Sequence, residues 1–349
     1  MNDSKGNGTN NLVSVIIPCY NAEKCVDKCL KSVLSQKYSN LEIITVNDAS
    51  KDKTLVKLQD YGKRDDRIVV LNNEKNAGVD VSRFRGIAAA HGDYLCFVDS
   101  DDWLSDTAIE KLLECAVQTN ADVVEGSITR VLGRYALAKH LCANKYKEIT
   151  TPELFDDYFI SFFGKNILNV ALWGKLYKRQ LFDNPDLKPS GFKMGEDLLL
   201  NMCIFPTISK YVIIEDNVYF YRYGGGTSRY NPNMYQDLKA QYYIKLATIK
   251  KYSYDKALRG TKIEMCNVLH SQIIQMLVYD YPYNEVKAFF DQEVESGFVD
   301  EITKNIDYRL AYYPFLERKD LDGIIATDRK VIRKGRIMKH IKKVLNMVL

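Results

Sequence analysis

Short apolar runs alternate with segments of helical spacing along the first hundred residues. Four runs have the length and composition of buried strands: Val13–Cys19, Leu41–Val46, Arg67–Leu71 and Tyr94–Val98. Between the first two runs, Val26, Leu30, Val33 and Leu34 recur at a spacing that is typical of an amphipathic helix. Strands that alternate with helices predict parallel βαβ units, with right-handed crossovers and a sheet covered on both faces.

The pattern is less regular in the rest of the chain. The elements expected there are a helix after Trp103 with Ser105 as its N-cap, a strand at Asp122–Val124, a short amphipathic helix at Pro152–Phe163, a strand at Val212–Tyr223 and helices from Met234 to Leu316. The predicted fold class is therefore α/β, with a Rossmann-like, mostly parallel central sheet flanked by helices and a helical C-terminal extension.

Composition places the chain among folded globular proteins. Of its 349 residues 46% are hydrophobic and 27% charged, which argues against a disordered chain. No apolar run approaches the roughly 18 residues of a membrane-spanning helix. Residues 1–11 lack the features of a secretory signal, so we expect a disordered leader and a cytoplasmic location. The eight cysteines form no C-x-x-C pair, and we expect reduced thiols, most of them in the core.

Positive charge is concentrated at the C-terminus. Residues 329–349 contain eight Lys or Arg and no Asp or Glu, whereas the first 328 residues carry 41 basic and 45 acidic side chains. Apolar residues, among them Ile337 and Ile341, recur at helical spacing between the basic ones. This pattern favours a basic amphipathic helix on an anionic membrane surface. The alternative is a helix that packs on the protein and leaves its basic face in solvent. No nucleic-acid partner is expected, because no recognition motif accompanies the charge.

Polar residues follow each predicted strand of the first half, where ligands bind in open α/β sheets. The fourth strand leads into Asp99-Ser100-Asp101-Asp102. Asp99 and Asp101 can direct two hard oxygen ligands at one divalent cation, which selects Mg²⁺ or Mn²⁺. The alternative is that Asp101 or Asp102 caps a following helix.

Three further acidic residues, in two segments, are candidates for chemistry. Asp48, after the second strand, can accept hydrogen bonds from a nucleobase or a ribose, or it can form a local Asx-turn. Glu196 and Asp197 precede an apolar run, where a carboxylate can act as a general base or can stabilise the start of a helix. Neither a G-x-G-x-x-G nor a P-loop motif is present, which argues against dinucleotide dehydrogenases and P-loop kinases.

Seven segments together resemble family 2 glycosyltransferases with the GT-A fold. In order along the chain they are VSVIIPCYNAE (Val13–Glu23), VNDASKD (Val46–Asp52), NAGVDVSRFRGI (Asn76–Ile87), GDYLCFVDSDD (Gly92–Asp102), WGKLYKRQLF (Trp173–Phe182), GEDLL (Gly195–Leu199) and YFYRYGGGTS (Tyr219–Ser228). The chain departs from the family pattern at Asn47, Asp80, Phe84 and Arg85.

The resemblance implies a role for each matching residue. For the nucleotide pocket the implied residues are Pro18, Tyr20, Glu23, Asp48 and Arg83, with Asp48 bonded to a uracil ring. For the metal and the diphosphate they are Asp99, Asp101, Arg222 and Ser228. For catalysis they are Asp197 as the base with Glu196 beside it, and for the acceptor side Trp173 and Lys175.

The implied function is transfer of a sugar from a nucleotide sugar, with a UDP-sugar expected, to a hydroxyl of a glycan or a lipid-linked acceptor in surface polysaccharide biosynthesis. A single displacement supported by Mn²⁺ or Mg²⁺ predicts inversion and a β-linkage. The alternatives are a catalytically silent nucleotide-sugar-binding scaffold and a sugar nucleotidyltransferase.

The expected organisation follows from the same reading. It comprises a glycosyltransferase domain at 12–230 with a nucleotide-sugar half at about 12–125 and an acceptor half at about 126–230, a helical extension at 231–328 and a basic tail at 329–349. The expected location is the inner face of the cell membrane, as a peripheral protein.

Overall fold

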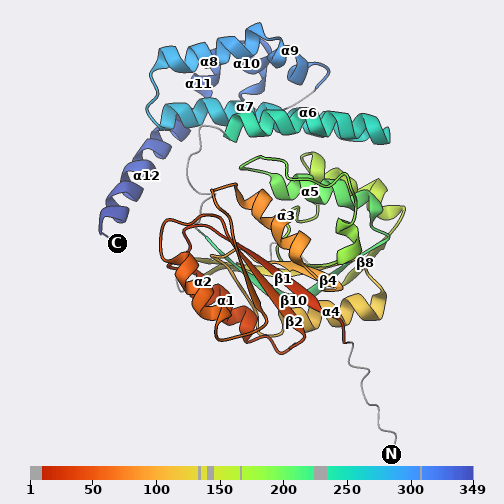
Figure 1. The fold of residues 1–349 in the computed structure, drawn as a ribbon. Coiled ribbons are helices and arrows are strands. Elements are labelled where there is room, and N and C mark those ends of the chain that lie inside the picture. Colours follow the sequence, from red (N-terminus) through yellow and green to blue (C-terminus); the bar gives the residue numbers. More distant parts are fainter. Residues whose placement is uncertain are drawn as a thin grey trace, which may run out of the picture. The chain divides into compact units, whose positions relative to one another are not determined.

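The computed structural model describes residues 10–132, 135–139, 145–165, 167–223, 234–306 and 309–348, with the backbone alone at 135–139 and 340–348. The chain divides into two compact units (Figure 1). The first comprises residues 1–162 and 166–229, and the second comprises residues 163–165 and 230–349. The second unit thus contains both the predicted helical extension and the predicted basic tail.

One sheet forms the centre of the first unit. Its main path runs β3-β2-β1-β4-β9-β6-β10-β5, with β7 paired to β6 and β8 to β10. The strands are β1 (Val13–Cys19), β2 (Leu41–Asn47), β3 (Ile68–Asn72), β4 (Tyr94–Phe97), β5 (Trp103–Leu104), β6 (Val123–Leu132), β7 (Tyr135–Lys139), β8 (Lys147–Thr150), β9 (Lys175–Lys178) and β10 (Lys210–Arg222). The four strands predicted for the first half are confirmed, and β1 to β4 pair in parallel. Beyond them β9 runs antiparallel to β4 and β6, so the complete sheet is mixed.

The central strand β1 shows how the sequence fits this sheet. All seven of its residues are buried, as expected for a strand covered on both faces. Pro18 is tolerated in a central strand because the ladder to β4 has already ended there. Val98 donates its N–H to the Ile16 carbonyl at 3.0 Å, and β4 stops at Phe97, so the missing proline N–H removes no ladder hydrogen bond.

Helices cover both faces of this sheet (Figure 1). The helices of the first unit are α1 (Val26–Leu34), α2 (Thr54–Gly62), α3 (Val79–Ala89), α4 (Ala108–Thr119) and α5 (Glu196–Ile204), with shorter turns at Leu154–Tyr158, Phe159–Phe163, Arg179–Phe182 and Phe205–Thr207. α1 and α4 share a core cluster with Val13, Val15 and Ile17 of β1. α3 packs on the opposite face, where a Cβ on Gly86 would lie 2.5 Å from the Ile16 side chain.

Two local predictions differ from the structure. Ser105 is not the N-cap of α4, because that helix begins at Ala108 and Thr107 occupies the capping position. The segment expected as one amphipathic helix at 152–163 consists of a π-helical turn followed by a 3₁₀ turn. Aromatic side chains pack along this segment, where the ring of Phe159 stacks against those of Phe155 and Phe205.

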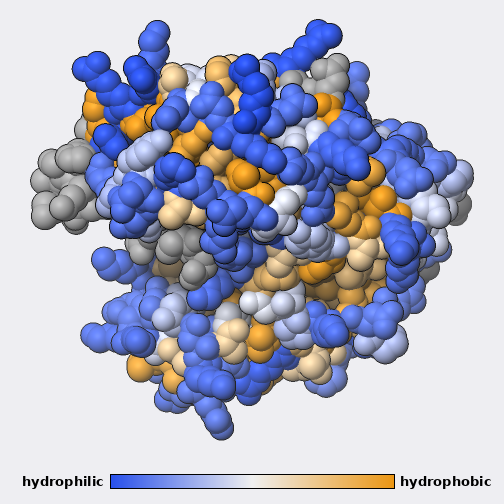
Figure 2. Space-filling model, turned by 90° about the horizontal axis from the view of Figure 1, so that it is seen from above, coloured by the Kyte–Doolittle hydropathy of each residue, from blue (hydrophilic) through white to orange (hydrophobic). Residues whose placement is uncertain are grey.

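The second unit is helical in its described residues, which confirms the predicted helical extension. Its helices are α6 (Met234–Tyr252), α7 (Leu258–Val278), α8 (Tyr283–Glu295), α9 (Phe298–Thr303), α10 (Tyr313–Glu317), α11 (Leu321–Thr327) and α12 (Arg329–Val348), with a 3₁₀ turn at Asp255–Ala257. α7 supplies much of the core, including Cys266, Leu269 and Ile273. On the face seen in Figure 2, patches of hydrophobic residues lie between hydrophilic ones.

The basic tail is the helix α12, and its first turns pack on α7. Arg336 donates a hydrogen bond to the Leu277 carbonyl at 2.9 Å, and Ile332 is buried. The alternative in which the tail packs on the protein therefore describes residues 329–339. Within the described ranges, no helix combines the length and the apolar character needed to cross a bilayer. The described cysteines are all free thiols, Cys203 is exposed, and Cys142 lies outside the described residues.

Candidate active site

The acidic segment after β4 forms a tight loop. A two-residue strand, β5, follows it, and α4 begins only at Ala108, so Asp101 and Asp102 do not cap a helix. Asp102 is buried, donates its N–H to the Asp99 carbonyl at 3.0 Å, and accepts hydrogen bonds from the Tyr219 hydroxyl at 2.8 Å and the Arg222 N–H at 2.6 Å. Burial and the charges of Asp99 and Asp101 raise the pKa of Asp102 to about 8.

Asp99 and Asp101, the candidate metal ligands, differ in their surroundings. One oxygen of Asp99 pairs with the Arg83 guanidinium at 2.9 Å, and its N–H donates to the Tyr219 hydroxyl at 3.1 Å. Asp101 is half-buried, and among the described side chains no Lys or Arg forms an ion pair with it. Burial and the neighbouring charge of Asp99 raise the pKa of Asp101. A cation at this carboxylate would therefore relieve an unfavourable charge.

Arg83, on α3, connects this loop to the second acidic pair. Its side chain is only 4% exposed. Nη2 pairs with Asp99, while Nη1 pairs with Glu196 at 3.0 Å and also with Asp197. The three carboxylates raise the pKa of Arg83 further above its usual range, although burial opposes them. The sequence comparison implied that Arg83 faces the nucleotide, whereas here its guanidinium lies between three carboxylates.

Glu196 and Asp197 are the first two residues of α5, directly after Gly195. Gly195 has a positive φ of 78°, which glycine adopts without strain. Asp197 also accepts the Leu172 N–H at 3.2 Å, so this carboxylate is oriented from two sides. Burial raises the pKa of both acids, and the charge of Arg83 lowers it. Their side chains point to Arg83 and Leu172, and both acids lie in the first turn of α5, where a negative charge also stabilises the start of a helix.

Asp48 holds the loop before α3 in place. It is buried and accepts hydrogen bonds from the Asn73 amide and from the backbone N–H groups of Ala77 and Gly78, each at 2.8 Å. These bonds fix the loop that leads into α3, so they help to position Arg83. A carboxylate offers about four acceptor sites and three are used here. Its hydrogen bond to a nucleobase stays a prediction.

The remaining nucleotide-pocket candidates lie at the end of β1. Tyr20 is 47% exposed, Glu23 is half-buried and accepts the Lys53 N–H at 3.3 Å, and Pro18 is buried within the strand. Tyr20 therefore offers the largest free surface of these three. The loop is tied to the one after β2, because Asn21 donates its N–H to Ser50 Oγ at 3.0 Å and accepts the Lys51 N–H at 2.8 Å.

Arg222 ends β10 beside the acidic loop. Its Nε donates to the Asp101 carbonyl at 2.9 Å, and its guanidinium lies over the Trp103 ring, 5.9 Å from the ring centre. This places a cation near the candidate metal ligands, as a contact with a diphosphate would require. Ser228, expected in the same closing segment, lies outside the described residues.

The two acceptor-side candidates behave differently. Trp173 is half-buried, and its ring stacks on Tyr219 and Tyr221 with ring centres 5.1 and 5.3 Å apart. Lys175, the other residue expected on the acceptor side, has a side chain that is only 2% exposed. Its ammonium donates to the Ala171 carbonyl at 2.6 Å and lies 3.9 Å from the Glu125 carboxylate. The buried charge of Glu125 accounts for the inward position of Lys175.

Two residues of the site, Tyr219 and Asp80, were given no role from the sequence. The Tyr219 hydroxyl accepts a hydrogen bond from the Asp99 N–H and donates one to the Asp102 side chain. The sequence did not indicate this role, because an aromatic residue in a strand is usually part of the core. Asp80, noted only as a departure from the family pattern, accepts hydrogen bonds from Ser190 Oγ at 2.7 Å and the Gly191 N–H at 3.1 Å. It thereby fixes the turn before Gly195.

The comparisons with known proteins identify the family. The model "Glycosyl transferase family 2" matches residues 14–184. A glycosyltransferase of Bacillus subtilis, EpsJ, described as uncharacterized, is 33% identical over 247 residues, which cover 69% of this chain and 70% of EpsJ. The chain belongs to glycosyl transferase family 2.

Two further relatives extend this result. Glycosyltransferase GlyA of Streptococcus pneumoniae is 32% identical over 220 residues, which cover 62% of this chain and 31% of GlyA, so the chain spans about a third of that relative's length. The crystal structure of S. aureus TarS 1–349 in complex with UDP-GlcNAc superposes with a TM-score of 0.69 at 20% identity, over 93% of this chain and 92% of that chain. The expected GT-A fold is thereby confirmed.

Proposed function

We propose that this family 2 protein transfers a sugar from a UDP-sugar to a hydroxyl of a glycan or lipid-linked acceptor in surface polysaccharide biosynthesis. The observation that carries the proposal is the position of Arg83. Its guanidinium contacts Asp99 with one nitrogen and Asp197 with the other. The candidate cation-binding loop and the candidate base are therefore separated by one guanidinium group. Such proximity is needed because the donor must be activated, and the acceptor hydroxyl deprotonated, around the same sugar carbon.

The acidic loop suits a divalent cation that the substrate helps to bind. Among the described residues, no group of three or more His, Cys, Asp or Glu side chains is arranged as a complete metal site. Asp101 has no ion-pair partner among the residues that the structure describes, and Asp99 has one oxygen outside its bond to Arg83. Mg²⁺ is usually held by one or two carboxylates together with substrate phosphates, and Mn²⁺ accepts the same oxygen ligands. When bound, such a cation would offset charge on the leaving diphosphate.

Asp197 is the proposed general base. Burial and the charge of Asp99 favour its protonated form, whereas Arg83 favours the carboxylate that a base must present. The acceptor hydroxyl would lose its proton to this carboxylate as its oxygen attacks the anomeric carbon. The bond to the diphosphate would break on the opposite face, so the configuration inverts. Arg222 would contact the departing phosphate from the acidic loop.

The donor class is inferred from the fold and from one neighbour. TarS shares the fold and binds UDP-GlcNAc in its crystal structure. In this chain Tyr20 presents an exposed ring at the end of β1, where a base could stack. We also propose that the protein is peripheral at the inner face of the membrane, because α12 carries the basic residues of the tail.

Calorimetric titration with UDP-, GDP-, dTDP- and CMP-sugars, in Mn²⁺ and again in EDTA, tests the donor site. We expect one UDP-sugar to bind in Mn²⁺ and to lose most of its affinity in EDTA. Absence of binding by every nucleotide sugar would contradict the proposal. The anomeric configuration of the product, read by NMR, tests the mechanism, and retention would exclude a single displacement.

A further inference from the structure

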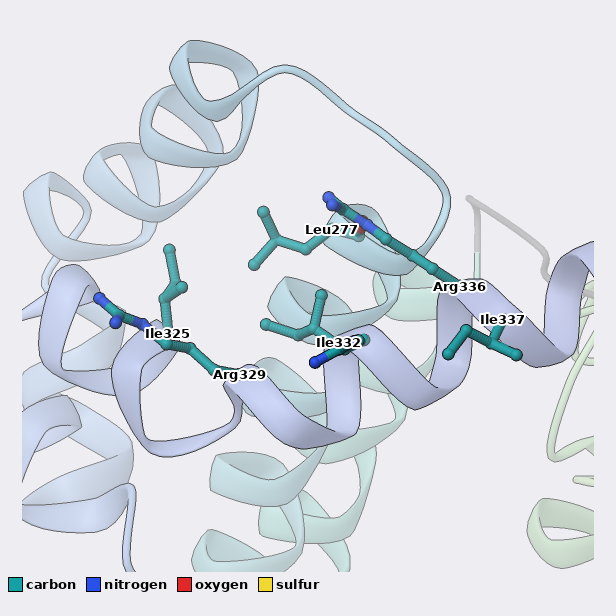
Figure 3. A pocket seen from close by; sticks show the side chains of 7 residues that line it. Leu277, Ile325, Arg329, Ile332, Arg336 and Ile337 are labelled. Carbon is teal, nitrogen blue, oxygen red and sulfur yellow. The ribbon is translucent and has the colours of Figure 1, made fainter.

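A groove in the second unit is lined by one face of α12 together with α7 and α11 (Figure 3). Its volume is about 560 Å³. The lining residues are of two kinds, aliphatic and arginine: Leu277, Ile325, Ile332 and Ile337, and Arg329, Arg333 and Arg336. An apolar floor beside several guanidinium groups fits a molecule that is anionic at one end and apolar at the other.

The charge of this groove is only partly balanced by the protein. Asp280 pairs with Arg336 at 3.2 Å and with Lys339 at 2.7 Å, and Asp328 pairs with His270 at 2.8 Å. Both acids are therefore already engaged. Within the described ranges, neither Arg329 nor Arg333 has a carboxylate at ion-pair distance, and both side chains are exposed. Arginine presents a planar fork of donors that matches a phosphate, and two such forks remain available here.

One apolar residue of the groove is also strongly exposed. Ile337 is 52% exposed, whereas Val331 and Met338, which are 54% and 45% exposed, do not line the groove. A free phosphate would leave the aliphatic side chains of the groove in water. Single-stranded nucleic acid is disfavoured because none of the lining residues is aromatic and could stack on a base. An acyl chain beside a phosphodiester would satisfy both parts of the groove.

We propose that this groove binds an anionic phospholipid. Its phosphate would contact Arg329 and Arg333, and the part of its acyl chain nearest the headgroup would lie against Ile325, Ile332 and Ile337. The proposal deepens the peripheral membrane location and does not depend on the transferase chemistry. It makes the contact site-specific, because α12 binds lipid while packed on α7. A free amphipathic helix would instead respond to each of its basic residues alike.

Flotation of the full chain with vesicles provides the test, using mixed phosphatidylglycerol–phosphatidylcholine vesicles and vesicles of phosphatidylcholine alone. The test variant is Arg329→Gln with Arg333→Gln. The matched control is Lys330→Gln with Lys334→Gln, which removes the same charge from exposed positions of α12 that do not line the groove. Diffuse attraction would cost both variants about fivefold per lost basic residue. The groove predicts that the arginine variant loses at least about tenfold more vesicle affinity than the lysine variant.

A second pair of variants tests the apolar floor. Ile337→Asn removes a groove residue, and Val331→Asn removes an equally exposed residue that does not line the groove. We expect weaker vesicle binding only for Ile337→Asn. Equal losses within either pair, or tighter binding of poly-glutamate than of vesicles through the same arginines, would overturn the proposal. Calorimetric donor binding should be unchanged in all four variants, so a failure of the lipid site and a failure of the transferase proposal give different results.

Discussion

Two acidic clusters of the first unit differ in how their charge is balanced. Glu196 and Asp197 share the buried guanidinium of Arg83. In the loop after β4, Asp99 also reaches Arg83, but Asp101 forms no ion pair with the described side chains. The first cluster thus contains its own cation, while the second leaves a carboxylate whose pKa is raised by burial and by Asp99. The difference indicates that the loop after β4, and not the pair of Glu196 and Asp197, binds an added cation.

The largest effect is expected at the cluster that contains its own cation. Asp197→Asn removes the proposed base, and we expect kcat to fall about 10²- to 10⁴-fold. Donor binding by calorimetry should stay near wild type, since the acidic loop is unchanged. Glu196→Gln is the matched control, because it also removes one negative charge that pairs with Arg83 but keeps Asp197. A similar loss of kcat in both variants would show that charge balance matters more than the base.

The buried ion pair of Lys175 and Glu125 extends the comparison to a third cluster of charged side chains. Lys175 and Glu125 are both almost fully buried, and the Tyr211 hydroxyl donates to Glu125. Lys175→Met leaves the Glu125 carboxylate buried without its cation, so we expect a loss of about 3–5 kcal/mol of unfolding free energy in urea. Adding Glu125→Gln should recover much of this loss. If Lys175→Met is as stable as wild type, the pair does not balance charge in the core.

In the loop after β4, the effect of removing a carboxylate on donor binding should depend on whether that carboxylate already bonds to the protein. Asp101→Asn should weaken Mn²⁺-supported donor binding by at least about 10- to 100-fold, the range found when an outer partner of a metal ligand is lost. Asp102→Asn should have a smaller effect, because Asp102 is directed to Tyr219 and to the Arg222 backbone. Calorimetry with and without EDTA measures both. A greater loss in Asp102→Asn would reverse the assignment of the ligands.

The sequence predicted the strands that carry these clusters better than the contacts within them. β1 to β4 have the hydrophobic pattern of buried strands, and the loop of Asp99, Asp101 and Asp102 follows β4, whereas Glu196 and Asp197 begin α5. The inward position of Lys175 could not be predicted, because it depends on Glu125, which lies 50 positions earlier in the chain. The three-way contact of Arg83 joins α3 to α5 across more than a hundred residues. Such pairings arise from the tertiary fold, so the spacing of residues along the sequence does not predict them.

The smallest expected effect concerns the pH dependence of stability at Glu196 and Asp197. Burial raises the pKa of this pair above the ordinary carboxyl range, and Arg83 only partly offsets it. A raised pKa in the folded state contributes stability below the ordinary value of about 4. That contribution is lost as pH rises through the folded-state pKa. Glu196→Gln cannot ionise at that position, so the stability of wild type relative to this variant should fall between pH 5 and pH 8.

Urea unfolding in EDTA at a series of pH values measures this difference. Glu295→Gln, at an exposed position of α8, serves as the control and should show no such trend. If the stability of wild type relative to Glu196→Gln rises with pH, Arg83 lowers the pKa of the pair by more than burial raises it. Arg83 would then hold both carboxylates charged throughout the neutral range. In that case Glu196 and Asp197 would both carry full negative charge before substrate binds, whereas burial and the charges of Asp99 and Asp101 would still keep the pKa of Asp102 raised to about 8.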